Sequence, residues 1–304
     1  MIPPFRFAFR AMAAVHELQV HAATLAQAQR AADAAIADVA RIEAKYSRYR
    51  DDSLVTRINR AAGGAPIAID AETAALLAYA DRCFEQSGGR FDVTSGVLRR
   101  VWDFRAADPR VPDAAALARV RALIGWRDVE WSEHAIRLPR GGMEIDFGGI
   151  GKEYAADRMA TILREHGIAS ALVNLGGDVR AVGAQHDGAP WRIGIRHPRD
   201  PARAIAGVDV VDAAVATSGD YERCIVVDGI RYSHLLDPRT GMPVTAWQSV
   251  SVVAPLCVLA GSLATIAMLL EADALPFLDA QSAAYVAVDA SGGVYRSPAI
   301  AAST

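Results

Sequence analysis

The 304-residue sequence predicts an α+β fold in which helices pack against mixed or antiparallel sheets. Strand-like alternation over residues 7–22 leads directly into a long amphipathic helical pattern, and residues 171–257 are rich in short strand patterns. No repeat or low-complexity linker divides the chain, so we expect one compact unit over residues 1–304. With 52% hydrophobic and 22% charged residues, the composition is typical of a soluble globular protein.

The N-terminal third is predicted to contain three helices. An Ala-rich pattern with regularly spaced charges predicts a helix over residues 23–46, and a Ser/Asp-rich loop at 47–53 precedes a short second helix. The third helix should run from Asp70 to Ser87, because Asp70 can cap its N-terminus and Gly88-Gly89 can end it. Loop residues therefore gather at 47–53 and 88–96.

The rest of the chain alternates strands, turns and helices. Residues 108–125 predict a loop and a helix, and short strands follow near 129–131 and 135–139. A strand over 143–147, a glycine turn, a helix over 154–166 and a strand over 171–174 together predict a βαβ-like unit. The last third should be strand-rich, with one helix over 258–270 and final strands near 283–289 and 293–296.

Charge and hydropathy restrict the possible partners. The net charge of −3 has both signs interspersed, which argues against nucleic-acid binding because phosphate neutralisation needs a concentrated basic surface. The longest apolar run, residues 254–270, is interrupted by Pro255 and Gly261, so we expect a buried helix and no membrane span. The first residues carry no signal-peptide pattern, which predicts a cytoplasmic location, or a periplasmic one if a signal has been removed.

Two glycine turns are candidate binding sites. In DFGGIGK, Asp146 to Lys152, a carboxylate precedes a tight turn and a lysine begins a helix, so backbone amides and Lys152 could bind anionic oxygens. A structural turn with a solvated lysine stays the alternative, because glycine patterns are weakly specific. NLGGD, Asn174 to Asp178, could let the backbone approach a ligand or form only a hairpin or bulge.

A polar turn around His234 is the candidate for acid–base chemistry. His234 lies within seven residues of Asp237, Arg239 and Thr240, and TSGD, residues 217–220, precedes it. An imidazole near its intrinsic pKa is the natural proton acceptor at neutral pH, so we weigh a functional role above a structural one. By contrast, FDVTSGVL at residues 91–98 lacks a nucleophile-elbow pattern, and loop packing or ligand contact is the favoured role.

Taken together, the motifs resemble the ApbE family of FAD:protein FMN transferases. The similarity covers nearly the whole chain in seven ordered blocks: FRAMA, YSRYRDDSLVTRIN, GGRFDVTSGVLRRVWDF, EIDFGGIGKEYAADRMATILREHGIASALVNLGGD, VATSGDYER, RYSHLLDPRTGMPV and AGSLATIAMLL. The resemblance implies a single ApbE-type, T-fold-like unit. It also implies that FAD is the donor substrate, that Mg²⁺ bridges its pyrophosphate, and that FMN passes to a Thr or Ser hydroxyl of a target flavoprotein while AMP leaves.

Matching positions carry the family's site residues over to this chain. The resemblance implies that His234 deprotonates the acceptor hydroxyl and that Asp237 or Asp220 orients it. It implies metal ligation by the Gly149 carbonyl and by Thr265. The residues expected to contact FAD are Met12, Tyr49, Arg90, Phe91, Asp92, Asp146, Lys152, Ser218, His234 and Leu235.

One departure from the family pattern bears directly on the metal. The family usually has Asp where this chain has Gly261, so the carboxylate that a hard cation prefers is missing from the late helix. The family's usual Lys-Gly is Lys152-Glu153 here, and Glu153 could bring a carboxylate near. The departure leaves two alternatives to transfer: hydrolysis of FAD to FMN and AMP, or a catalytically impaired FAD-binding protein.

Overall fold

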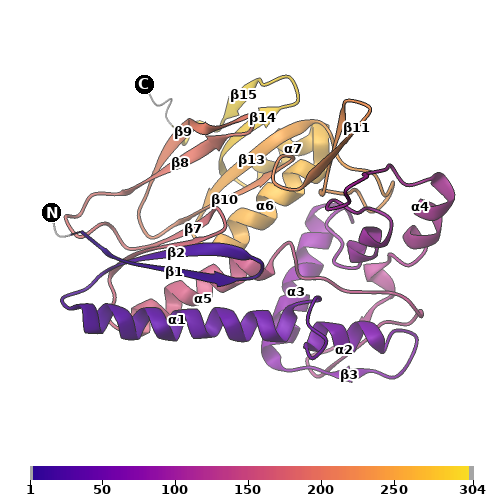
Figure 1. The fold of residues 1–304 in the computed structure, drawn as a ribbon, viewed down its shortest axis with the longest axis horizontal. Helices are drawn as coiled ribbons and strands as arrows, with labels where there is room; N and C mark the ends of the chain where they lie inside the picture. Colours follow the sequence, from indigo (N-terminus) through magenta and orange to yellow (C-terminus); the bar gives the residue numbers. More distant parts are fainter. Residues whose placement is uncertain (1–2, 301–304) are drawn as a thin grey trace.

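Eight strands form the central sheet of the computed structural model, which describes residues 3–300 (Figure 1). Each strand pairs antiparallel with its neighbours. In spatial order the strands are β1 (Phe5–Ala11), β2 (Ala14–His21), β6 (Ser170–Leu175), β7 (Asp178–Val182), β10 (Ala214–Gly219), β13 (Trp247–Ala254), β14 (Ala284–Asp289) and β15 (Val294–Arg296).

The N-terminal segment forms a hairpin where the alternation over residues 7–22 had suggested one strand. Met12 and Ala13 reverse the chain with positive φ angles of 49° and 61°. Two consecutive positive φ angles characterise the two-residue hairpin turn whose twist matches its strands. The alternation continues on both sides of the turn, and this is why the reversal is hidden in the hydropathy pattern.

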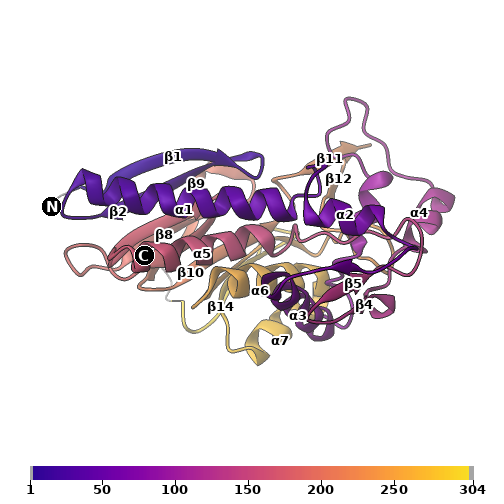
Figure 2. The same cartoon turned by 90° about the horizontal axis from the view of Figure 1, so that it is seen from below.

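Three helices cover one face of the sheet, each beneath its own pair of strands. α1 (Leu25–Tyr46) packs on β1 and β2, α5 (Gly151–Glu165) on β6 and β7, and α6 (Cys257–Leu270) on β10 and β13. Figures 1 and 2 show α1 and α5 running side by side, with α6 next to α5. α5 therefore lies between the other two helices and contacts both of them.

The other face of the sheet is covered by a hairpin. β8 (Trp191–His197) and β9 (Asp200–Val210) bring Trp191, Ile193 and Val208 against Val179 and Val215. Val215 belongs to this second core, whereas its neighbours Ala214 and Ala216 belong to the core beneath the helices. This alternation is the two-residue period of a strand buried on both faces.

The remaining elements lie mainly around the end of the sheet at which α3 is seen in Figure 1. They are helices α2 (Leu54–Arg60), α3 (Ala71–Gln86), α4 (Ala114–Arg121) and α7 (Ala274–Ala280), the 3-10 helices η1 (Ser95–Arg100), η2 (Trp126–Asp128) and η3 (Glu271–Asp273), a small sheet of β3 (Ile67–Ala68), β5 (Ala135–Arg137) and β4 (Glu130–Trp131), and the hairpin β11 (Cys224–Val227) with β12 (Ile230–Ser233). The predicted cap is present, since Asp70 Oδ1 accepts a hydrogen bond from the Thr73 amide at 3.0 Å. The α+β prediction is confirmed.

The strand predicted over residues 143–147 does not form, and the prediction of a βαβ-like unit is therefore wrong. Ile145 is fully buried, but its backbone bonds to a side chain: its amide donates to Asn59 Oδ1 at 2.7 Å, and its carbonyl accepts from Asn59 Nδ2 at 3.0 Å. The next amide, of Asp146, donates to the Val93 carbonyl at 2.9 Å. A side chain and a loop thus replace a neighbouring strand, which hydropathy cannot reveal.

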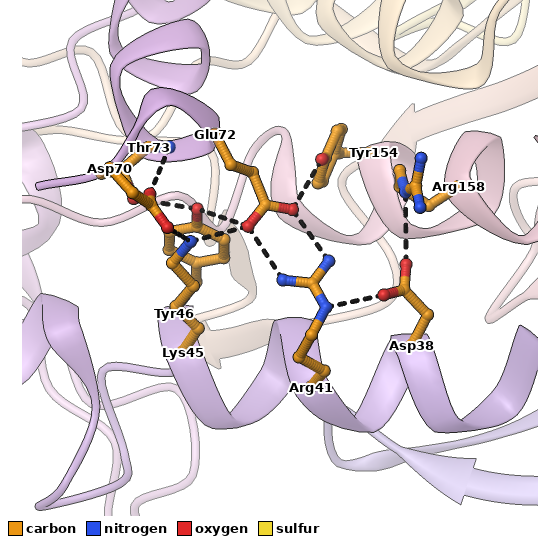
Figure 3. Close-up of polar contacts among 9 residues, drawn as sticks. All are labelled: Asp38, Arg41, Lys45, Tyr46, Asp70, Glu72, Thr73, Tyr154 and Arg158. Atoms are coloured by element: carbon orange, nitrogen blue, oxygen red, sulfur yellow. Dashed lines mark hydrogen bonds and ion pairs between the residues drawn. The ribbon is translucent and has the colours of Figure 1, made fainter. Parts of the chain in front are cut away.

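A polar network fixes α5 to two other helices (Figure 3). Glu72, in the first turn of α3, accepts hydrogen bonds from Arg41 of α1 at 2.8 Å and from the Tyr154 hydroxyl of α5 at 2.8 Å. Further along α5, Arg158 Nε lies 3.3 Å from Asp38 Oδ2. The Arg41 guanidinium holds the pKa of Glu72 well below its usual range. The beginning of α5 is consequently held in a defined position.

The stretch Cys257–Ala280, which contains α6, is long and apolar enough to cross a membrane by length and composition, with a mean hydropathy of 1.6. The sequence interpretation had treated its first part as too interrupted for that. In the structure 56% of the most apolar 18-residue window of this stretch is buried, and α6 packs on β10 and β13. A core helix passes the same test of length and composition, so this observation is weak evidence for a membrane span.

Candidate functional site

The glycine turn before α5 places Lys152 in the first turn of that helix. The Lys152 ammonium forms an ion pair with the Asp178 carboxylate, which is almost fully buried. Burial lowers the pKa of Lys152, but the neighbouring carboxylates of Asp178 and Glu153 outweigh this effect and raise it. Lys152 therefore carries its charge at neutral pH and supplies a fixed positive centre.

The turn itself offers fewer free amides than the sequence predicts. Gly148 N–H donates to Asp146 Oδ1 at 3.0 Å. The amides of Ile150 and Gly151 both donate to the Phe147 carbonyl, at 3.0 and 2.7 Å. Anion binding by the turn then depends on the amides at the start of α5 and on Lys152.

The second glycine turn joins β6 to β7 as a hairpin, the structural alternative that the sequence left open. Gly176 and Gly177 have φ angles of 63° and 100°, and the Gly177 amide donates to Asn174 Oδ1 at 2.9 Å. The hairpin nevertheless serves the site, because it places Asp178 beside Lys152. Asp178 is a site residue that sequence reasoning missed; its position at the end of the turn was the available signal.

His234 follows β12, and its orientation is set by one carbonyl group. Its amide and its Nδ1 both lie within hydrogen-bonding distance of the Arg223 carbonyl, at 3.0 and 3.2 Å. A carbonyl oxygen can only accept, so Nδ1 carries the proton and Nε2 is left as the acceptor. Burial lowers the pKa of His234 to about 4, and the charges of Arg223 and Lys152 act in the same direction. The imidazole is neutral at pH 7.

Asp237 and Asp220 have partners other than His234. Asp237 Oδ1 accepts from the Arg239 amide at 2.8 Å and from Arg239 Nε at 3.0 Å. Asp220 holds Arg199 through two hydrogen bonds of 2.6 Å. We expected a carboxylate to orient His234, but in the structure the Arg223 carbonyl holds the imidazole ring. Whether either aspartate is catalytic stays a prediction.

Two of the expected ligand-binding residues meet across β10 and α6. The Ser218 and Thr265 hydroxyl oxygens are 2.7 Å apart. Gly149, the predicted carbonyl ligand, lies against Phe91: a Cβ atom at position 149 would be 3.1 Å from the Phe91 ring. The glycine at 149 therefore lets the turn approach the aromatic ring.

The loop after α3 is packed tightly against the glycine turn. Phe91 is 6% exposed, and its amide donates to Ser87 Oγ at 2.8 Å. Asp92 is buried and accepts from the Thr94 amide and hydroxyl at 2.7 and 2.6 Å. Asp146, which forms an ion pair with Arg99, is joined to this loop through its amide. Asp92 and Asp146 thus have structural partners as well as their predicted ligand role.

The remaining predicted contacts are spread around this centre. Tyr49 is 71% exposed, and the Arg48 guanidinium lies over its ring at 5.4 Å. The Met12 amide donates to Glu43 Oε1 at 2.8 Å. Leu235 packs on the main core, and the buried Nε of Arg90 has no hydrogen-bond partner among the described residues. An exposed aromatic ring beside a polar site is suited to stacking on a planar ligand.

Glu153, the second residue beyond Gly151, points into the space beside Gly261. The residue is almost completely buried, and its Oε2 has no hydrogen-bond partner in the described part of the structure. Burial raises the pKa of Glu153 to about 7, and the negative charge of Asp178 adds to the effect. In the described part of the chain, no three His, Cys, Asp or Glu side chains are grouped as a metal site.

Comparison with known proteins places this arrangement in a family. Residues 12–287 match the model of the ApbE family. Two relatives named FAD:protein FMN transferase, from Treponema pallidum and Vibrio cholerae, are 36% and 34% identical to this chain. Each alignment covers 73% of this chain, and they cover 66% and 67% of the respective relatives. The chain thus matches about two-thirds of their length.

Solved structures give the same answer over nearly the whole chain. The ApbE protein of Thermotoga maritima superimposes with a TM-score of 0.90 at 30% identity, covering 97% of both chains. The flavinyl transferase ApbE of Pseudomonas stutzeri superimposes with a TM-score of 0.86 at 28% identity, covering 97% of this chain and 95% of the other. The resemblance seen in the sequence blocks is confirmed, and the chain belongs to the ApbE family.

Proposed function

We propose that this chain transfers FMN from FAD to a Thr or Ser hydroxyl of a target flavoprotein and releases AMP. The names of the matched relatives support flavin transfer with FAD as the donor. They favour transfer over the alternatives of FAD hydrolysis and of an impaired FAD-binding protein.

The observation that carries the proposal is a neutral imidazole that can accept a proton, together with a charged lysine in the first turn of α5. His234 presents Nε2 as a proton acceptor, and Lys152 lies near enough for its charge to lower the pKa of His234. A base that is already deprotonated at pH 7 can take a proton from a hydroxyl. A cation beside it attracts the negatively charged pyrophosphate whose bond is to be broken.

The transfer requires one bond to form and one to break at phosphorus. The acceptor hydroxyl oxygen attacks the phosphorus that carries the riboflavin group, and a new P–O bond forms. The bond from this phosphorus to the bridging oxygen breaks, and AMP leaves with that oxygen. The hydroxyl proton passes to Nε2 of His234. Lys152 stabilises the negative charge that develops on the phosphate oxygens.

A divalent cation fits the residues present. The unpaired Oε2 of buried Glu153 and the hydroxyls of Thr265 and Ser218 are oxygen donors of the kind that Mg²⁺ prefers. We propose that the Thr265 hydroxyl and the Gly149 carbonyl hold Mg²⁺. The ion would neutralise charge on the FAD pyrophosphate. Mg²⁺ sites commonly use few protein ligands together with substrate phosphates, so the absence of a larger carboxylate cluster among the described residues is compatible.

The test is to incubate the protein with FAD, Mg²⁺ and a flavodomain bearing a Ser/Thr acceptor, and to look for a fluorescent protein band after denaturing electrophoresis. We expect a band with the native protein and a loss of about a hundredfold or more in rate for His234→Gln. An acceptor with its hydroxyl residue changed to Ala is the matched control. AMP release of equal rate with and without the acceptor would instead show hydrolysis.

A further inference from the structure

Position 261 and the side chain of Glu153 compete for one volume. A Cβ atom built on Gly261 would lie 2.6 Å from Glu153 Cγ and 3.0 Å from Glu153 Oε1. Non-bonded carbon atoms make their best contact at about 3.5–4.0 Å, so any side chain at 261 would force Glu153 to move. The carboxylate of Glu153 therefore occupies the place that an aspartate on α6 would fill.

One oxygen of the Glu153 carboxylate lacks a hydrogen-bond partner among the described residues. The residue lies in the first turn of α5 and is 8% exposed, and its buried Oε2 has no hydrogen-bond partner among residues 3–300. Leaving a buried acceptor without a partner costs about 1–3 kcal/mol, and more when the group is charged. A bound ligand that interacts with Glu153 Oε2 would remove this cost.

The surroundings supply further oxygen atoms for that partner. Thr265 follows Gly261 by one helical turn on α6, so the two positions lie on the same side of the helix. Thr265 Oγ1 is 2.7 Å from Ser218 Oγ on β10. One carboxylate and two hydroxyl groups are thus presented from three different elements.

We propose that Glu153 is the anionic protein ligand of a divalent cation, replacing in position the carboxylate that α6 lacks at Gly261. The proposal rests on the proposed function for the identity of the phosphate ligand, FAD. In this arrangement the negatively charged ligand comes from α5 instead of α6, and the hydroxyl ligand, Thr265, still comes from α6. Lys152, the residue before Glu153, stays paired with Asp178.

The relocation is tested by measuring Mn²⁺ binding directly, with electron paramagnetic resonance of free Mn²⁺, in the absence and presence of FAD. Glu153→Gln keeps the shape of the side chain and removes its charge. We expect it to weaken Mn²⁺ binding by about tenfold or more, because ligand charge largely sets affinity. We also expect the rise in melting temperature that Mn²⁺ causes in the native protein to disappear, while the metal-free variant unfolds at the same or a higher temperature.

A swap variant separates ligation from general disturbance. Glu153→Gly combined with Gly261→Asp moves the carboxylate to α6 and opens the space that it needs, so Mn²⁺ affinity should return to within about threefold of the native value. Glu153→Gly alone should bind as weakly as Glu153→Gln. Circular dichroism shows whether the swap variant folds. If it does not fold, the Mn²⁺ affinity of Glu153→Gln decides whether Glu153 is a ligand.

The proposal is overturned if Glu153→Gln binds Mn²⁺ as tightly as the native protein, if the folded swap variant fails to regain affinity, or if the native protein binds no Mn²⁺ with or without FAD. The proposed function fails differently. Its failure is the lack of FAD binding or of a fluorescent product in the native protein, whatever Glu153 contributes to Mn²⁺ binding.

Discussion

Asn59→Ala should destabilise the protein by removing the substitute for a missing strand. The Asn59 side chain makes hydrogen bonds of 2.7 and 3.0 Å to the amide and carbonyl of fully buried Ile145. Each buried backbone group left without a partner costs about 1–3 kcal/mol. Asn59 itself is partly buried, and some water could enter after truncation. We therefore expect a loss of about 2–4 kcal/mol in the free energy of unfolding.

The assay is urea denaturation followed by circular dichroism, with FAD affinity measured on the same preparations. Arg60→Ala is the matched control, because Arg60 is the next residue on α2 and its guanidinium forms a salt bridge with exposed Asp51. That variant should change stability by less than about 1 kcal/mol. FAD affinity should fall with Asn59→Ala, since Ile145 adjoins Asp146 and the glycine turn. A stability change below about 0.5 kcal/mol in Asn59→Ala would refute the reasoning.

Three further predictions concern the site. His234 has a pKa of about 4 in the folded protein and about 6.5 in the unfolded chain, so the unfolded chain binds more protons between these values and stability falls as pH drops. His234→Gln should therefore reduce the stability lost between pH 7 and pH 5 by about 1–2 kcal/mol. Equal losses in both proteins would contradict the lowered pKa of His234. Trp102 Nε1 donates to the Gly241 carbonyl at 2.7 Å, so Trp102→Phe should cost about 1–3 kcal/mol in thermal unfolding, and no shift in melting temperature would count against this anchor of the 237–241 turn. Lys152→Gln should weaken FAD binding about tenfold or more, measured by flavin fluorescence, and Lys152→Arg should retain more affinity than Lys152→Gln. Identical FAD affinities for Lys152→Gln and the native protein would show that the charge of Lys152 does not contribute to binding.

Elements with a strong periodic pattern or a cap could be predicted from the sequence. The helix expected over residues 23–46 is observed over Leu25–Tyr46, and the helix capped by Asp70 is observed over Ala71–Gln86. Both depend on local signals, which are amphipathic spacing and a capping side chain. The strand over 143–147 failed because the partner of Ile145 is the side chain of Asn59, more than eighty residues earlier in the chain.

The site was predictable in residue type but not in pairing. The motifs indicated Lys152 and His234, and the charge of Lys152 contributes to the lowered pKa of His234. No motif indicates that the Arg223 carbonyl, rather than Asp237 or Asp220, holds His234, because such a bond involves a backbone atom that every residue has. Likewise, the inward direction of Glu153 depends on how α5 packs against α6, which no motif encodes. That residues 1–304 form one unit stays a prediction.

The contact between Gly261 and Glu153 also limits the mutational paths open to this chain. Gly261→Asp on its own introduces a Cβ atom where Glu153 Cγ already lies, and Glu153→Gly on its own removes the buried carboxylate. Either single step should be less fit than both end points, so the two positions are epistatic. A chain with carboxylate side chains at both positions should therefore be rare.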